Sequence, residues 1–400
     1  MNPPTVARGV TSLVFDAVDH TSRIVEGMHA NIAAAPPPFG KGTDQRTRGV
    51  TGLVYTSIRI VNQVARTVTD LVLDLSSRGS QSHAPERESD SFRSVLNGVL
   101  GDHLFDSGNP LAIPTSFRRR GGSLPLDREG LAAAVPEATG KILLLVHGLC
   151  MSDRSWRRRG HDHGAALERE LGYTAVYLRY NSGRHVSENG RELAALLETL
   201  LASWPVAVEE LTIVAHSMGG LVARSAYHYA VEAGRRWPEQ LSRLVFLGTP
   251  HHGAPLERGG NWLQSMASVS PYTAPLSRLG MLRSAGITDL RFGNVTDEDW
   301  RDCDRFARGA DGRVCVPLPA RIDCHAIAAT LGGADHFLGD GLVPVASALG
   351  RHSEARRCLS FAESRQWVGV RMNHLELLDR PEVYAKLGEW LAIRRTSSPR

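Results

Sequence analysis

From Lys141 onward, hydrophobic residues come in short, nearly uninterrupted runs. Between the first four runs lie segments of ten residues or more that look helical. Short apolar or β-branched runs that alternate with helices are typical of a mainly parallel sheet with helices on both faces. We therefore predict five strands, at Ile142–Val146, Thr174–Leu178, Leu211–Ala215, Leu244–Leu247 and Ile322–Ala329.

The first 140 residues follow a different pattern. Apolar residues between Val10 and Met28 recur every three or four positions, as in an amphipathic helix, and the prolines at 36–38 end it. The stretch Arg8–Phe15 returns as Arg48–Tyr55 with six of eight positions identical, which indicates a duplicated helical unit. A polar, charged run at 76–91 then reads as a linker.

These patterns divide the chain into three parts. We predict an N-terminal helical region with its linker at 1–90, a connecting segment at 91–140 and an α/β domain at 141–400 that closes with a helix at Glu382–Ile393. The interval at about 254–320 is rich in Pro, Gly, Trp and Arg and predicts a cap inserted over the sheet. The large apolar residues of the cap could line an acyl pocket or form the cap's own core. They are Trp262, Met266, Tyr272 and Leu276.

Composition narrows the class of protein. About half of the 400 residues are apolar or glycine, which excludes a wholly disordered or collagen-like chain. The net charge is only +4, and three of the 46 basic residues are lysine, so arginines matched by acids argue against nucleic-acid binding and suggest GC-rich, bacterial coding. The five scattered cysteines form neither a disulfide framework nor a zinc motif, which fits a reducing cytoplasm. We expect no export signal and no membrane span.

A candidate nucleophile follows the third predicted strand. Ser217 lies in the pattern A-x-S-x-G, between Ala215 and Gly219, and the helical run Leu221–Ala233 comes directly after it. A sharp turn from strand to helix needs small residues two positions before and after the serine, because the two backbones approach closely there. The five residues alone would equally suit a serine at a helix N-terminus.

The chain order of the remaining groups favours the catalytic interpretation. A serine hydroxyl needs a histidine that accepts its proton and a carboxylate that orients the histidine. Asp340 follows the fifth predicted strand, with Asp335 as a nearby rival, and His374 follows the run Trp367–Val370. Four other histidines compete with His374 for the role of base, but each either precedes Asp340 or lies on the strand or loop of Asp340. They are His251, His252, His325 and His336.

Two backbone N–H groups are candidates for an oxyanion hole. Met218 directly follows the nucleophile, and Leu149 follows the glycine of Val146-His147-Gly148 after the first strong strand. We expect His147 to be structural. Cys150 has no histidine placed to activate it, so we predict a partly buried, unreactive thiol there.

Six segments together resemble the lipase-type α/β-hydrolase superfamily, in particular its GPI inositol-deacylase-like (PGAP-type) branch of serine esterases. They are VHGLCMSDRSW, RYNSGRHVSENGRELAALL, VAHSMGGLVARSAYHYA, FLGTPHHGAPLERGGNWL, LGDGLVPVASALG and MNHLELL, and they fall between about Gly140 and Leu391. The resemblance implies an α/β-hydrolase fold and a serine ester hydrolase without a cofactor. It implies a triad of Ser217, Asp340 and His374, with Leu149 and Met218 as oxyanion donors. Some relatives bind calcium through an aspartate at the position of Glu376; we expect no metal here.

The sequence thus predicts a cytoplasmic serine esterase or lipase that acts on a small-molecule or lipid ester through an acyl-enzyme. An acyltransferase with the same triad and a non-catalytic interaction protein on a hydrolase fold are the alternatives. The arginine runs at 118–120 and 157–159 are either solvated surface charge or a peripheral contact with acidic lipids. The N-terminal helices could lie on a membrane, bind a partner or dock on the hydrolase domain, and we favour docking. The oligomeric state stays open.

Overall fold

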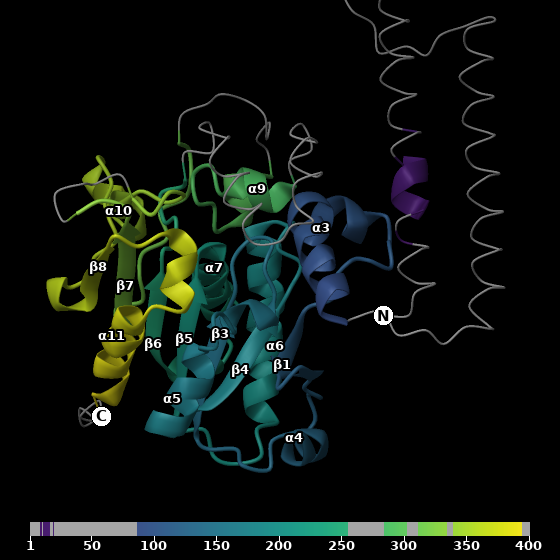
Figure 1. Cartoon of the computed structure of the whole chain (residues 1–400), viewed down its shortest axis with the longest axis horizontal. Helices are drawn as coiled ribbons and strands as arrows, with labels where there is room; N and C mark the ends of the chain where they lie inside the picture. The colour runs from purple at the N-terminus through teal and green to yellow at the C-terminus, as the bar shows by residue number, and fades with distance from the viewer. Residues whose placement is uncertain are drawn as a thin grey trace, which may run out of the picture. The chain divides into compact units, whose positions relative to one another are not determined.

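The computed structural model describes residues 9, 11–16, 19, 86–254, 284–301, 311–333 and 339–393. Within these ranges eight strands form one sheet, in the order β2-β1-β4-β3-β5-β6-β7-β8 (Figure 1). Strand β1 runs antiparallel to β2 and β4, and the other neighbours are parallel. The strands are β1 (Ser116–Arg119), β2 (Gly122–Ser123), β3 (Lys141–Val146), β4 (Thr174–Arg179), β5 (Glu210–His216), β6 (Leu241–Leu247), β7 (Asp323–Thr330) and β8 (Gln366–Val370).

Helices cover both faces of this sheet. Helices α6 and α7 pack together on one face, and α5 and α11 lie on the other (Figure 1). Together with the parallel central strands, this arrangement confirms the predicted α/β-hydrolase fold. The helices are α3 (Glu86–Asp106), α4 (Arg128–Ala134), α5 (His163–Leu171), α6 (Val186–Ala202), α7 (Met218–Glu232), α9 (Ala285–Asp289), α10 (Val345–Ala348) and α11 (Pro381–Ala392).

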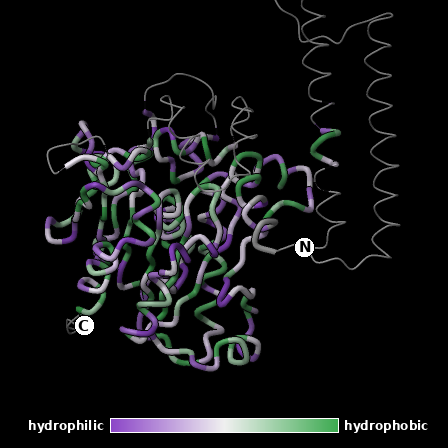
Figure 2. Tube along the Cα trace, viewed as in Figure 1, coloured by the Kyte–Doolittle hydropathy of each residue, from purple (hydrophilic) through white to green (hydrophobic). Residues whose placement is uncertain are grey.

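The central strands are apolar on both faces because two separate cores lie against them. In β3, Ile142, Leu144 and Val146 face the core beneath α6 and α7, whereas Leu143 and Leu145 face the core beneath α5 and α11. Side chains alternate along a strand, so a strand buried on both faces reads as an unbroken hydrophobic run. Hydrophobic residues, green in Figure 2, accordingly recur along the strands and along the helices that cover them.

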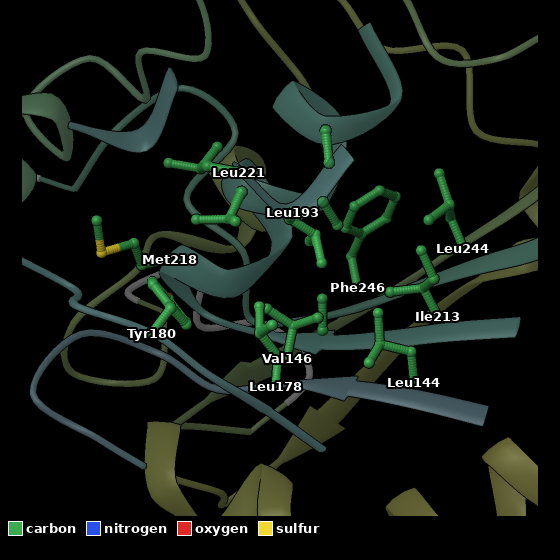
Figure 3. Close-up of a cluster of buried hydrophobic side chains, with 14 of the residues drawn as sticks. Leu144, Val146, Leu178, Tyr180, Leu193, Ile213, Met218, Leu221, Leu244 and Phe246 are labelled. Atoms are coloured by element: carbon green, nitrogen blue, oxygen red, sulfur yellow. The ribbon is translucent and has the colours of Figure 1, made fainter. Parts of the chain in front are cut away.

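The core beneath α6 and α7 joins strands and helices that are far apart in sequence. Figure 3 shows Leu144 of β3, Ile213 of β5 and Phe246 of β6 beside Leu193 of α6 and Leu221 of α7. All five side chains are at most 1% exposed. This packing fixes α7 against the carboxyl ends of the strands, where ligands bind in open parallel sheets.

Each of the five predicted strands is present, with ends within three residues of those predicted. Strands β1 and β2 were not predicted, since they fall in the segment read as a connection. The motif SFRR hides the alternation of β1, because its inward positions are Phe117 and the buried Arg119. That guanidinium is stabilised by Glu168 at 2.6 Å and Glu137 at 2.7 Å.

Much of two predicted regions lies outside the described residues. The second copy of the duplicated unit and the linker to residue 85 belong there, as does most of the predicted first helix beyond residue 16. So do 255–283 and 302–310 of the predicted cap, with Trp262, Met266, Tyr272 and Leu276. The domain division and the cap therefore stay predictions. Among the helices that the structure describes, none combines the length and apolar character that crossing a membrane requires.

We expect truncation of the buried ring in β6 to destabilise the domain strongly. Phe246 is fully buried, so Phe246→Ala removes a large apolar side chain and leaves a cavity, at a cost of about 3–5 kcal/mol in the free energy of unfolding. Urea denaturation measures this loss. The control is Val231→Ala on α7, where a half-exposed side chain should change stability by less than about 0.5 kcal/mol. Equal losses in both variants would contradict the described core.

Candidate active site

Ser217 occupies the turn between strand β5 and helix α7. Its φ is +55° and its ψ is −128°, a conformation that residues other than glycine rarely adopt. Its N–H donates to the carbonyl oxygen of Leu247 at the end of β6, at 2.8 Å. The side chain is half-buried. A strained residue persists only where its surroundings fix it, and such residues cluster at functional sites.

The glycine two positions after Ser217 is required by packing. A Cβ at Gly219 would lie 2.5 Å from the carbonyl oxygen of His147 and 2.6 Å from that of Val146. The start of α7 therefore presses against the end of β3. This close approach is the physical reason that the sequence pattern demands a small residue there.

Asp340 and His374 form a buried pair. Nδ1 of His374 donates to Oδ2 of Asp340 at 2.7 Å, and the backbone N–H of His374 donates to the carbonyl oxygen of Asp340 at 3.1 Å. The second carboxylate oxygen accepts from the N–H groups of Leu342 at 3.0 Å and Val343 at 2.8 Å. These bonds fix both side chains. Because Nδ1 carries the proton toward Asp340, Nε2 of a neutral His374 is an acceptor.

This pair lies at the same edge of the sheet as Ser217. The rings of His216 and His374 have centroids 4.7 Å apart, and Nε2 of His216 donates to the carbonyl oxygen of His374 at 3.1 Å. A Cβ at Gly248, which follows Leu247, would lie 3.0 Å from Cε1 of His374. The structure thus brings together the neighbourhoods of Ser217, Asp340 and His374.

Leu149 and Met218 also lie beside Ser217. Met218 begins α7, so its N–H has no acceptor inside the helix. Gly148 precedes Leu149, and a Cβ there would lie only 3.0 Å from Cβ of Ser217. The loop that bears Leu149 therefore passes directly along the serine.

Residues after β4 hold this loop in place. The Tyr180 hydroxyl donates to the carbonyl oxygen of His147 at 2.8 Å, and the Ser182 hydroxyl accepts from the N–H of Cys150 at 3.0 Å. The rings of Tyr180 and His147 stack with centroids 4.4 Å apart. Tyr180, Asn181 and Ser182 all lie in the turn that follows β4. Its polar residues support the loop from a buried position.

Burial keeps the neighbouring histidines and thiol unreactive. It lowers the pKa of His147 to about 3 and the pKa of His216 well below its usual value. It raises the pKa of the Cys150 thiol, and this residue is only 2% exposed. His147 and His216 are therefore neutral at pH 7, and Cys150 is a protonated thiol.

The rival residues lie elsewhere or outside the described part. His251 and His252 follow β6 but face Arg224 and Arg313, and the ring of His325 on β7 packs against Trp390 with centroids 4.5 Å apart. Asp335 and His336 are not among the described residues. Within the described ranges, no three His, Cys, Asp or Glu side chains gather closely enough to hold a metal ion.

Sequence reasoning missed the role of His216. It contacts His374 from a position directly before the nucleophile, and its ring also meets Trp156 edge-on at 6.5 Å. The only sequence signal was a polar residue at the end of an otherwise apolar strand. That signal does not indicate which distant residue the imidazole would meet.

Comparisons with known proteins give a partial family match and several fold relatives. Residues 114–290 match a family model described as a domain of unknown function (DUF7379). No curated protein is similar enough to the sequence to count as a match. The mature Bacillus licheniformis lipase BlEst2 is 19% identical, with 63% of this chain and 92% of that chain covered and a TM-score of 0.41.

Two further solved structures are similar to a comparable degree. Aspergillus fumigatus lipase B is 14% identical, with 82% of this chain and 81% of that chain covered and a TM-score of 0.41. The Pyrococcus furiosus esterase Pf2001 is 14% identical, with 64% and 82% covered and a TM-score of 0.40.

We expect glycine to be more stable than alanine at position 217. Only glycine adopts a positive φ without strain, so Ser217→Gly should exceed Ser217→Ala by about 1 kcal/mol in the free energy of unfolding. Urea denaturation of both variants measures the difference. The control is the same pair at Ser203, where φ is −95° and alanine should be the more stable. Alanine as the better residue at both positions would contradict the strained turn.

We expect the domain to lose stability in mild acid. Burial lowers the pKa of His163 from 6.5 to about 4, so below pH 6.5 the unfolded chain takes up a proton that the folded chain does not. Stability therefore falls as the pH falls from about 6.5 to about 4, by about 1.4 kcal/mol per pH unit for each such histidine. Urea midpoints at pH 7, 6 and 5 measure the slope. His163→Gln should reduce it, and an unchanged slope would refute this origin.

Proposed function

We propose that the protein is a serine esterase that cleaves carboxylic esters through an acyl-enzyme, with Ser217 as nucleophile, His374 as general base and acid, and Asp340 as the orienting carboxylate. The observation that supports this most strongly is the 2.7 Å hydrogen bond from Nδ1 of His374 to Oδ2 of Asp340, beside a serine held at positive φ. Serine hydrolases on unrelated folds share such a set of three groups.

The proposed reaction uses the groups in two half-reactions. Nε2 of His374 takes the proton of Ser217 as its oxygen attacks the ester carbonyl, and Asp340 stabilises the resulting imidazolium. The alcohol leaves with that proton, and the acyl group stays on Ser217. His374 then takes a proton from water, which attacks the acyl-enzyme and releases the acid. No redox or metal chemistry enters these steps.

Backbone N–H groups would stabilise the charge that develops during attack. We assign this role to Leu149 and Met218. The loop that bears Leu149 passes along Ser217, and Met218 begins α7 directly after the serine. Donors fixed by a folded backbone need no reorganisation when the carbonyl oxygen becomes negative. The hydrogen bonds from Tyr180 and to Ser182 support this assignment, since they immobilise the loop that bears Leu149.

The substrate class that we propose is a small-molecule or lipid ester. The six sequence segments that resemble GPI inositol-deacylase-like esterases lead us to place the chain in that branch. Assays with esters that differ in their alcohol part and in the length of their acyl chain would define the substrate further. Turnover in the presence of added alcohols distinguishes hydrolysis from acyl transfer.

We expect a fluorophosphonate probe to label Ser217 once, as intact-protein mass spectrometry would show. Ser217→Ala should abolish labelling and lower kcat/KM for p-nitrophenyl esters by about 10⁴-fold or more, because the nucleophile is lost. His374→Gln and Asp340→Asn should also lower kcat/KM strongly. The matched control is Ser225→Ala, a buried serine farther along α7, which should leave labelling and turnover unchanged.

Three results would contradict this proposal. Labelling that persists in Ser217→Ala would place the nucleophile elsewhere. A loss of equal size in Ser225→Ala would show that the helix, and not the hydroxyl, matters. A folded wild-type protein that neither reacts with the probe nor turns over short and long esters would favour the interaction-protein alternative.

A further inference from the structure

A pocket of about 220 Å³ has a lining that includes none of the five residues of the proposed active site. We call it the arginine pocket. It is built from α7, the loop after β6 and three later segments, and its lining includes Arg224, His251, His252, Arg313, Arg356 and Arg357. Cys315 and Cys358 also line it. Neither the fold prediction nor the proposed esterase mechanism gives these side chains a role.

The described acids that contact the pocket's arginines are fewer than the arginines. Asp311 pairs with Arg313 at 2.8 Å and with Arg357 at 3.4 Å. Glu354 pairs with Arg356 at 2.8 Å and with Arg357 at 3.4 Å. These two carboxylates thus pair with three of the pocket's four guanidinium groups.

Arg224 has the strongest need for an anion. It is only 7% exposed, and among the described residues no carboxylate forms an ion pair with it. Its Nη2 donates to the carbonyl oxygen of Val316 at 2.6 Å, and Nη1 lies 3.5 Å from Nδ1 of His251. Burial lowers the pKa of Arg224 to about 10, so the guanidinium stays charged at pH 7. A buried charge is costly unless an opposite charge accompanies it.

The nearby acid Asp299 does not satisfy this need by contact. Its carboxylate accepts from the backbone N–H groups of Val295, Thr296 and Val314, at 2.8–2.9 Å. It raises the pKa of Arg224 only as a minor influence, behind the lowering by burial and by the charge of Arg313. The hydrogen bonds of this carboxylate therefore go to backbone N–H groups, and it forms no ion pair with Arg224.

The two histidines in the lining are uncharged at neutral pH. Burial lowers the pKa of His252 to about 4 and that of His251 well below its usual value, so both rings are neutral at pH 7. Nδ1 of His251 faces Arg224 and Nδ1 of His252 faces Arg313 at 3.4 Å, which leaves the proton of each ring on Nε2. The charged side chains in the lining are therefore all guanidinium groups.

We propose that the arginine pocket binds a small phosphate-bearing anion. Guanidinium groups present planar pairs of N–H donors that match phosphate oxygens, and Arg224 forms no ion pair with a described carboxylate. The volume suits inorganic phosphate or the phosphate end of a larger molecule. This inference does not depend on ester hydrolysis, because none of the proposed catalytic residues lines the pocket.

The first test is thermal unfolding of the whole chain in inorganic phosphate, with sodium chloride at equal ionic strength as reference. We expect a saturable rise of Tm by a few degrees, since a ligand that binds only the folded state stabilises it. Glycerol 3-phosphate and vesicles that contain phosphatidic acid, assayed by cosedimentation, then distinguish a soluble phosphomonoester from a lipid headgroup. No saturable binding of any of the three probes would overturn the proposal.

Variants locate the binding. The side chain of Arg356 is mostly exposed, so Arg356→Gln should fold normally and weaken phosphate binding by about tenfold, as expected for one lost charged contact. Arg224→Lys keeps the charge but loses the planar donors and should weaken binding further. The control is Arg169→Gln on α5, an exposed arginine beside Glu170. Full phosphate binding by Arg356→Gln would overturn the proposal by itself, so the outcome does not depend on whether Arg224→Lys folds.

The two pocket thiols give an independent readout. Cys315 and Cys358 are exposed, whereas Cys150 and Cys324 are buried, and burial raises the pKa of Cys324 to about 12. We expect saturating phosphate to slow alkylation of Cys315 and Cys358 by iodoacetamide several-fold, as peptide mapping by mass spectrometry would show. Unchanged rates at both thiols would mean that phosphate binds elsewhere and would overturn the proposal.

Discussion

The turn from β5 into α7 is the constraint on which the candidate site depends. Ser217 is held at φ +55° from two sides, by the hydrogen bond to Leu247 on β6 and by the close packing of Gly219 against the end of β3. Neither contact could fix the turn if the sheet were loose. The two cores above and below the sheet supply the rigidity, since α7 cannot shift without disturbing side chains that are almost completely buried.

Buried imidazoles and buried guanidinium groups are stabilised in different ways. Imidazoles such as those of His147, His163 and His216 are buried as neutral rings, because their charged forms would be poorly solvated. Arginines cannot lose their protons at neutral pH and need partners. Arg119 has Glu168 and Glu137, and several members of the two arginine runs likewise contact acids. Arg224 departs from this pattern, which is why its surroundings suggest an anion.

The sequence alone predicted those features that local chemistry determines. The central strands were recognisable because burial on both faces leaves an uninterrupted hydrophobic run, and the turn at Ser217 because its small neighbours are adjacent in sequence. The placement of Asp340 and His374 followed from chain order, and the structure brings them into contact; their catalytic roles remain for experiment. Strand β1 was missed because an inward arginine breaks its hydrophobic pattern.

The arginine pocket lay beyond prediction because its parts, from Arg224 to Leu359, meet only in the fold. The two proposed sites also differ in the kind of charge that they would stabilise. An ester carries no charge before attack, so fixed N–H groups stabilise the transition state more than the substrate. A guanidinium cluster instead attracts an anion that is charged throughout. Helix α7 begins at the first site and bears Arg224 at the second. It would therefore help to stabilise the transient oxyanion at its start and a bound anion along its side.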